Sequence, residues 1–141
     1  MTDLVSLIDH AILHPTATVS DLEQGCHLAD QLGVATVCVK PYWVAAATAL
    51  LAESSVGVGT VIGFPHGSNN PAVKAAEAEQ ACDDGATELD MVVNVGQVLE
   101  GAWQSVQEDI AVVCELARRR GALLKVIFET DFVTADEDKT R

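Results

Sequence analysis

The chain has 141 residues, of which 49% are hydrophobic and 4% aromatic, so it is long enough to bury the core of one ordinary domain. Its formal net charge of -13 argues against a nucleic-acid partner, because such binding depends on clustered lysine and arginine side chains that neutralise phosphates. No stretch of about 18 apolar residues is free of charges and turn residues, which predicts a soluble protein without a membrane partner.

The N-terminus and the cysteines indicate in which cellular compartment the protein is expected. Residues 1–4 lack the basic and then apolar profile of a signal peptide, so we expect a cytoplasmic protein. The cysteines form no C-x-x-C pair and lie in apolar patterns, which favours reduced packing residues over disulfides or metal ligands; they are Cys26, Cys38, Cys82 and Cys114.

The first predicted elements are a short strand over residues 7–13 and a helix over residues 18–33. The helix has Thr18 or Ser20 as its N-cap, and Glu23 stands in capping-box position to Ser20. A glycine directly after the apolar pattern is expected to stop the helix.

The same alternation continues to the end of the chain. Further strands are predicted over residues 34–39, 56–62, 88–94 and 123–129, and helices over residues 42–53, 71–84 and 97–120, with a helix start at 134–138. Five strands, each followed by a helix or its beginning, indicate an α/β fold with a parallel sheet. Right-handed connections of this kind cover both faces of a sheet or wrap a barrel.

One carboxylate, Asp90, stands in the middle of the otherwise apolar strand at residues 88–94. An ionised carboxylate without partners in a low-dielectric interior costs several kcal/mol or has its pKa raised. Such a residue is either held by buried donors or used for proton transfer. The loop that follows at Asn94 places this strand end at a site, so we interpret Asp90 as a functional residue.

Five strand-end segments carry a family resemblance: residues 8–13 (IDHAIL), 37–44 (VCVKPYWV), 61–67 (VIGFPHG), 88–94 (ELDMVVN) and 124–130 (LKVIFET). In this order and spacing the chain resembles the deoxyribose-phosphate aldolases over essentially its whole length. The resemblance implies a TIM-type (β/α)8 barrel, truncated here to about five β/α units, with residues 1–141 as a single partial β/α-barrel domain. Complete barrels of this type need ~250 residues.

The resemblance also implies the chemistry. Family members cleave 2-deoxy-D-ribose 5-phosphate reversibly to acetaldehyde and D-glyceraldehyde 3-phosphate through a lysine Schiff base, without a metal or another cofactor. The expected partners are therefore a small-molecule sugar phosphate and aldehydes.

The family's two catalytic lysines are expected outside this chain. The Schiff-base lysine belongs to a Lys-Thr-Ser-Thr-Gly motif on the sixth strand and the second lysine to a Lys-Ala-Ser-Gly-Gly motif on the seventh, and neither motif occurs here. We therefore expect a complementing C-terminal part, or self-association through the open edge strands at residues 7–13 and 123–129. The alternative function is an inactive remnant that acts only by associating with a partner chain.

Residue by residue, the resemblance implies Asp90 as the proton-relay carboxylate and pocket positions at Asp9, Leu13, Cys38 and Lys125. Side chains alternate along strands, so Asp90 and Lys125 could lie within ~5 to 8 Å of each other across neighbouring strands. An ion pair that fixes the barrel interior remains an equal alternative for Lys125.

Other residues are weaker candidates. His10 and His14 have i, i+4 spacing, but Pro15 and a strand-like context argue against a zinc pair. His66 follows a proline in a loop and is a candidate for the mouth of the site. The tryptophans are expected to anchor the core or an interface; they are Trp43 and Trp103.

Overall fold

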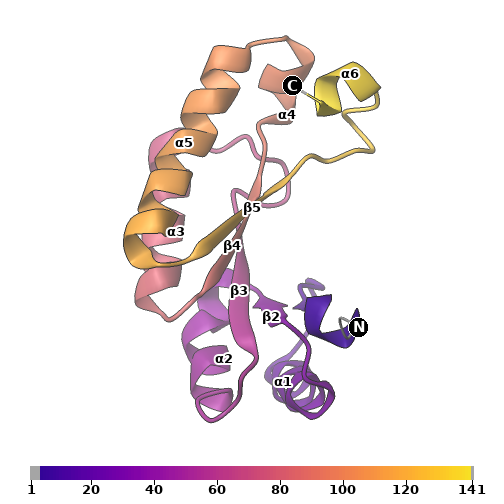
Figure 1. Ribbon diagram of the computed structural model, residues 1–141, viewed down its shortest axis with the longest axis vertical. Helices are drawn as coiled ribbons and strands as arrows, with labels where there is room; N and C mark the ends of the chain where they lie inside the picture. The colour runs from indigo at the N-terminus through magenta and orange to yellow at the C-terminus, as the bar shows by residue number, and fades with distance from the viewer. Residues whose placement is uncertain (1–3, 141) are drawn as a thin grey trace.

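The computed structural model describes residues 4–140 (Figure 1); residues 1–3, on which the expectation about targeting partly rests, lie outside them. Five parallel strands form one sheet in sequential order: β1 (Asp9–Ile12), β2 (Thr36–Val39), β3 (Gly57–Ile62), β4 (Glu88–Val92) and β5 (Leu123–Ile127). This arrangement confirms the predicted parallel alternation. The observed strands are shorter than predicted, and the first begins only after a 3-10 helix, η1 (Leu4–Leu7).

The helices follow the strands in the predicted order: α1 (Val19–Leu32), η2 (Pro41–Trp43) with α2 (Val44–Leu50), α3 (Pro71–Asp83), α4 (Val95–Leu99), α5 (Trp103–Arg120) and α6 (Asp136–Lys139). Of the two predicted N-caps of α1, Thr18 is confirmed, and the capping by Ser20 and Glu23 is wrong. The backbone N–H of Thr18 donates to Asp21 Oδ2 at 2.6 Å. This contact forms a capping box two residues earlier than the Ser20 pattern suggests.

The single helix predicted over residues 97–120 is also wrong, because two helices occupy that segment. Gly101 follows α4 and has a left-handed backbone conformation with φ of 68°, which a glycine adopts at little steric cost. This conformation prevents the helix from continuing. The chain then begins α5 at Trp103. The apolar pattern continues through this break, so periodicity alone did not reveal it.

The main core lies between the outer face of the sheet and the helices. Strand residues that alternate with the site positions point into it, among them Val37 and Val39 of β2 and Leu89 and Met91 of β4, all fully buried. Trp43 belongs to this core, as predicted. Side chains on the opposite face of the same strands therefore point toward the inside of the curved sheet.

The two predicted edge strands are at the edges. Within residues 4–140, β1 pairs with β2 alone and β5 with β4 alone. No residue of β5 is buried. No helix in this part of the chain combines the length and the apolar character needed to cross a membrane.

Candidate active site

Lys125 on β5 places its ammonium group among three carboxylates on the inner face of the sheet. Its Nζ atom lies 2.5 Å from Asp9 Oδ2, 2.7 Å from Glu88 Oε1 and 3.1 Å from Asp90 Oδ1. Asp9 and Lys125 are on the first and last strands of the sheet, which in a flat sheet would be separated by four spacings of about 4.8 Å. Their contact therefore requires a strongly curved sheet, as in an arc of a barrel.

The predicted proximity of Asp90 and Lys125 is confirmed. The two residues are direct partners in the register of β4 and β5, and their side chains form an ion pair. The alternative for Lys125, an ion pair in the barrel interior, also fits these contacts, because its ammonium pairs with three carboxylates. The side chain of Lys125 is 37% exposed, so its ammonium group is still partly accessible to solvent.

Glu88 and Thr36 belong to the same cluster, and the sequence reasoning missed both. The Thr36 hydroxyl lies 2.6 Å from Asp9 Oδ1, to which it donates, and 3.5 Å from Glu88 Oε1. The available signal was the two-residue strand period, since Glu88 shares a face with Asp90 and Thr36 shares one with Cys38.

The contacts within this cluster shift the pKa values of Lys125 and Asp9. Partial burial opposes the effect, but the hydrogen bonds to Asp9 and Glu88, together with the nearby negative charge of Asp90, raise the pKa of Lys125 above its usual range. Burial likewise opposes the shift at Asp9, where hydrogen bonds from Lys125 and Thr36 lower the pKa of the carboxyl group. Three carboxylates around one ammonium leave two negative charges uncompensated within the cluster.

Asp90 has a buried carboxylate oxygen that no hydrogen-bond donor of residues 4–140 reaches. Its Oδ2 atom accepts a hydrogen bond from Cys38 Sγ at 3.6 Å. Its Oδ1 atom is buried and accepts no hydrogen bond from residues 4–140, although it lies near the Lys125 ammonium. Burial, followed by the charge of Asp90 and that hydrogen bond, raises the pKa of the Cys38 thiol to about 12, so the sulfur stays protonated at neutral pH.

Leu13 lies apart from the charged cluster. It is half-buried and lines a hollow of about 130 Å³ with Lys40, Val61 and Phe64. Val61 of β3 pairs in register with Asp90 of β4, so the hollow borders the strand pair that carries Asp90. Lys40 directly follows β2, and its ammonium lies 4.3 Å from the centre of the Trp43 ring.

The histidines do not enter the charged cluster. His66 is exposed in the loop after β3, and His14 Nδ1 lies 2.8 Å from the Thr16 hydroxyl. Within residues 4–140, no group of three or more histidine, cysteine, aspartate or glutamate side chains has a geometry that could hold a metal ion.

The contribution of Asp9 to stability should depend on pH. Asp9→Asn should lower the free energy of unfolding at neutral pH by about 1 kcal/mol or less, because water screens a pair that is one-third exposed. The folded pKa of Asp9 lies below the ordinary value of 3.8, so its contribution is complete above that value and is lost as the pH falls through the folded pKa. Urea unfolding of both proteins at several pH values measures this; a difference that grew on acidification would contradict it.

Comparisons with known proteins agree on one family. The model of the DeoC/LacD family aldolases matches residues 4–138. The chain is 48% identical over 139 residues to a deoxyribose-phosphate aldolase of Rhodopirellula baltica, covering 99% of this chain and 57% of that protein. It is 44% identical over 137 residues to the Crocosphaera subtropica enzyme of the same name, covering 97% and 61%.

A solved structure supports the fold. The tetrameric deoxyribose-phosphate aldolase of Aeropyrum pernix matches with a TM-score of 0.83 at 32% identity, over 91% of this chain and 53% of that one. The predicted fold class, five units of a β/α barrel, is thereby confirmed. The chain spans about three-fifths of the length of the curated relatives it matches.

Proposed function

The chain belongs to the DeoC/LacD family of aldolases, and from this we propose that it supplies the N-terminal five β/α units of a deoxyribose-phosphate aldolase. The reaction is the reversible cleavage of 2-deoxy-D-ribose 5-phosphate to acetaldehyde and D-glyceraldehyde 3-phosphate through a lysine Schiff base. We assign residues 1–141 to one partial barrel domain and the protein to the cytoplasm.

The observation that carries the proposal is the buried Oδ1 atom of Asp90, which accepts no hydrogen bond from residues 4–140. A Schiff-base aldolase needs a group that moves protons during formation of the carbinolamine and the enamine. Asp90 offers a fixed carboxylate oxygen with free capacity, whereas both oxygens of Asp9 are hydrogen-bonded. We therefore assign proton relay to Asp90 and the lining of the pocket to Asp9, Leu13, Cys38 and Lys125.

Lys125 is not the nucleophile of this proposal. An amine attacks a carbonyl carbon only in its unprotonated form, and the three carboxylates keep Lys125 protonated at neutral pH by raising its pKa. The two uncompensated negative charges of the cluster would instead favour further cations nearby. The lysines that the resemblance places on later strands would supply these charges and the nucleophile.

Borohydride trapping tests the proposal. We expect the 141-residue chain, incubated with acetaldehyde and borohydride, to form no lysine adduct and to cleave no sugar phosphate. The completed protein, in which the segment that follows the matched part of the Rhodopirellula baltica relative is fused to this chain, should form one adduct in the added segment and cleave the substrate.

Two outcomes would contradict this assignment. Labelling of Lys125 together with cleavage by the isolated chain would show that the nucleophile lies within residues 1–141. A completed protein that unfolds cooperatively but neither traps acetaldehyde nor cleaves the substrate would favour the alternative, an inactive partner that acts only by association.

A further inference from the structure

Helix α3 holds both ends of the loop that precedes it, the β3–α3 loop at residues 63–70. The carboxylate that does so belongs to Glu77, a half-buried residue near the middle of the helix. Its Oε2 atom accepts a hydrogen bond from the Gly63 backbone N–H at 2.7 Å, and its Oε1 atom accepts one from Asn69 Nδ2 at 3.0 Å. Neither contact belongs to the charged cluster around Lys125, so the role of Glu77 needs a separate explanation.

These contacts lie where the pairing between β3 and β4 stops. The register of β3 with β4 ends at Ile62, and the next residue, Gly63, has a left-handed backbone conformation. Beyond this point α3 supplies partners for both strand ends. Glu77 accepts from the Gly63 N–H, and the fully buried Lys74 donates to the Val92 carbonyl at 3.1 Å. Because Lys74 and Glu77 are three positions apart, one face of α3 holds the ends of two neighbouring strands.

The β3–α3 loop also packs on the end of β4, the strand that carries Asp90. Gly67 lies so close to this end that a Cβ atom at Gly67 would be 1.9 Å from the Val93 carbonyl oxygen. The Gly67 N–H donates to the Gly63 carbonyl at 2.7 Å, which closes the loop over this contact. Movement of the loop would therefore change the packing of the strand end that follows Asp90.

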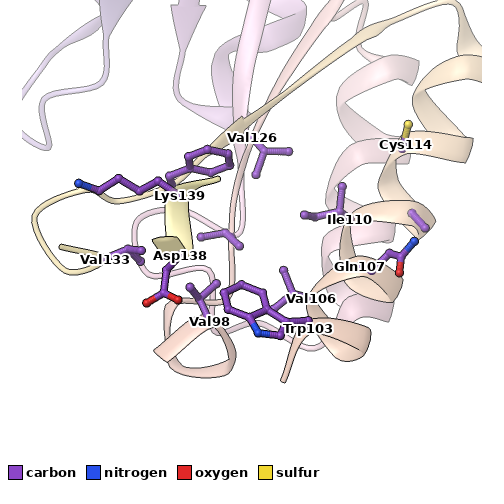
Figure 2. A pocket seen from close by; sticks show the side chains of 13 residues that line it. Val98, Trp103, Val106, Gln107, Ile110, Cys114, Val126, Val133, Asp138 and Lys139 are labelled. Carbon is purple, nitrogen blue, oxygen red and sulfur yellow. The ribbon is translucent and has the colours of Figure 1, made fainter. Parts of the chain in front are cut away.

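The other side of the same strand end is more open. Val93 lines a groove of about 650 Å³ between α5 and β5, and Figure 2 shows Ile110 and Val126 among the side chains around it. Open space of this size provides few contacts, because dispersion attraction requires atoms within about 4 Å. Side chains therefore hold the end of β4 less tightly on this side than α3 and the loop do on the side of β3.

The β3–α3 loop reaches the proposed substrate pocket through Phe64. Phe64 and Glu77 line the hollow of about 130 Å³ together with Leu13, which the proposed function assigns to the pocket. The loop follows the carboxyl end of β3, and active sites of β/α barrels lie on that face. Because Phe64 directly follows Gly63, the hydrogen bond between Gly63 and Glu77 fixes the position from which the Phe64 side chain extends.

We propose that Glu77 is a positioning residue of the aldolase, which holds the β3–α3 loop so that Phe64 and the end of β4 keep the shape of the substrate pocket. The inference rests on the proposed function, because the pocket is the one assigned there. Glu77 acts through the loop, while proton relay stays with Asp90. Loss of Glu77 should therefore weaken the binding of ground state and transition state alike, which raises KM and leaves kcat nearly unchanged.

Substitutions in the completed protein test this role by steady-state kinetics. Glu77→Ala removes both hydrogen bonds and should raise the KM for 2-deoxyribose 5-phosphate by about five- to tenfold, with kcat within about twofold of the parent value. Glu77→Gln should restore nearly the parent KM. Its amide oxygen can accept from the Gly63 N–H, and its amide nitrogen can donate to Asn69 Oδ1 once the Asn69 amide has rotated.

Glu79→Ala is the matched control. It removes the same charge and adds the same alanine at an exposed position of α3, outside the contacts with the loop. Both kinetic constants of this variant should equal those of the parent.

Hydrogen exchange of the same completed proteins provides a measurement that does not depend on catalysis. In Glu77→Ala, the backbone N–H groups of Gly63 and Gly67 should exchange about tenfold faster than in the parent, because the loop is no longer held at its ends. Exchange within α5 should change little. Glu77→Gln and Glu79→Ala should show the parent rates in the loop.

The outcomes separate the role of Glu77 from the proposed function. Faster loop exchange together with a raised KM, both reversed in Glu77→Gln, would support the role. Unchanged loop exchange in Glu77→Ala, a parent KM despite faster exchange, or an equal rise of KM in Glu79→Ala would overturn it.

A completed parent protein that binds the sugar phosphate but does not cleave it would contradict the proposed function alone. Weaker binding by Glu77→Ala than by Glu77→Gln in calorimetry would then still support the positioning role. Equal binding by these two variants would overturn that role, whether or not the parent cleaves the substrate.

Discussion

Asp90→Asn in the completed protein should lower turnover of 2-deoxyribose 5-phosphate by ~10² or more and leave the fold intact. The amide keeps the shape of the carboxylate but cannot take up a proton in the relay. Lys125 would still be held by Asp9 and Glu88, so the position of its ammonium should change little. Steady-state kinetics and thermal unfolding of the parent and the variant measure both effects.

Asp83→Asn is the matched control for this substitution. Asp83 is an exposed carboxylate at the end of α3 that pairs with Arg120 at the end of α5. Because Asp83 lies outside the charged cluster, its amide variant should keep the parent turnover. A completed Asp90→Asn protein with parent turnover would remove Asp90 from the mechanism. Equal losses in both variants would point to a general effect of the changed charge.

Lys74→Met should lower the free energy of unfolding by about 3 to 5 kcal/mol. Lys74 on α3 is fully buried, and its ammonium lies 2.6 Å from Asp109 Oδ2 on α5, which is 3% exposed. The same ammonium donates to the Val92 carbonyl at 3.1 Å. Methionine would leave the Asp109 carboxylate without its counter-charge in an apolar environment. Urea unfolding followed by tryptophan fluorescence measures the loss.

The double variant Lys74→Met with Asp109→Leu separates charge burial from packing. Replacing both partners with apolar residues removes the unpaired charge, so most of the lost stability should return. Lys139→Met is the surface control, because Lys139 pairs with a 97% exposed Asp136 and should change stability by only about 0.5 kcal/mol. A Lys74→Met variant as stable as this control would contradict the argument.

Strand periodicity and turn residues determined much of the fold and part of the candidate site. The alternation of strands and helices follows from local patterns, and the two-residue period places Asp90 and Lys125 on equivalent faces of neighbouring strands. Local sequence patterns gave wrong predictions where two patterns overlapped in one segment. The apolar period of residues 97–120 continues across Gly101, and Ser20 with Glu23 resembles the capping box that Thr18 and Asp21 form.

Only the tertiary structure decided which distant side chains meet. The curvature of the sheet brings Asp9 on β1 to Lys125 on β5, 116 positions apart in the chain. The packing of α3 against α5 buries Lys74 with Asp109, although each sequence segment alone is compatible with an exposed charge. A local pattern specifies the face of an element on which a residue lies, whereas its partner depends on how the elements pack, and many residues distant in sequence determine that packing together.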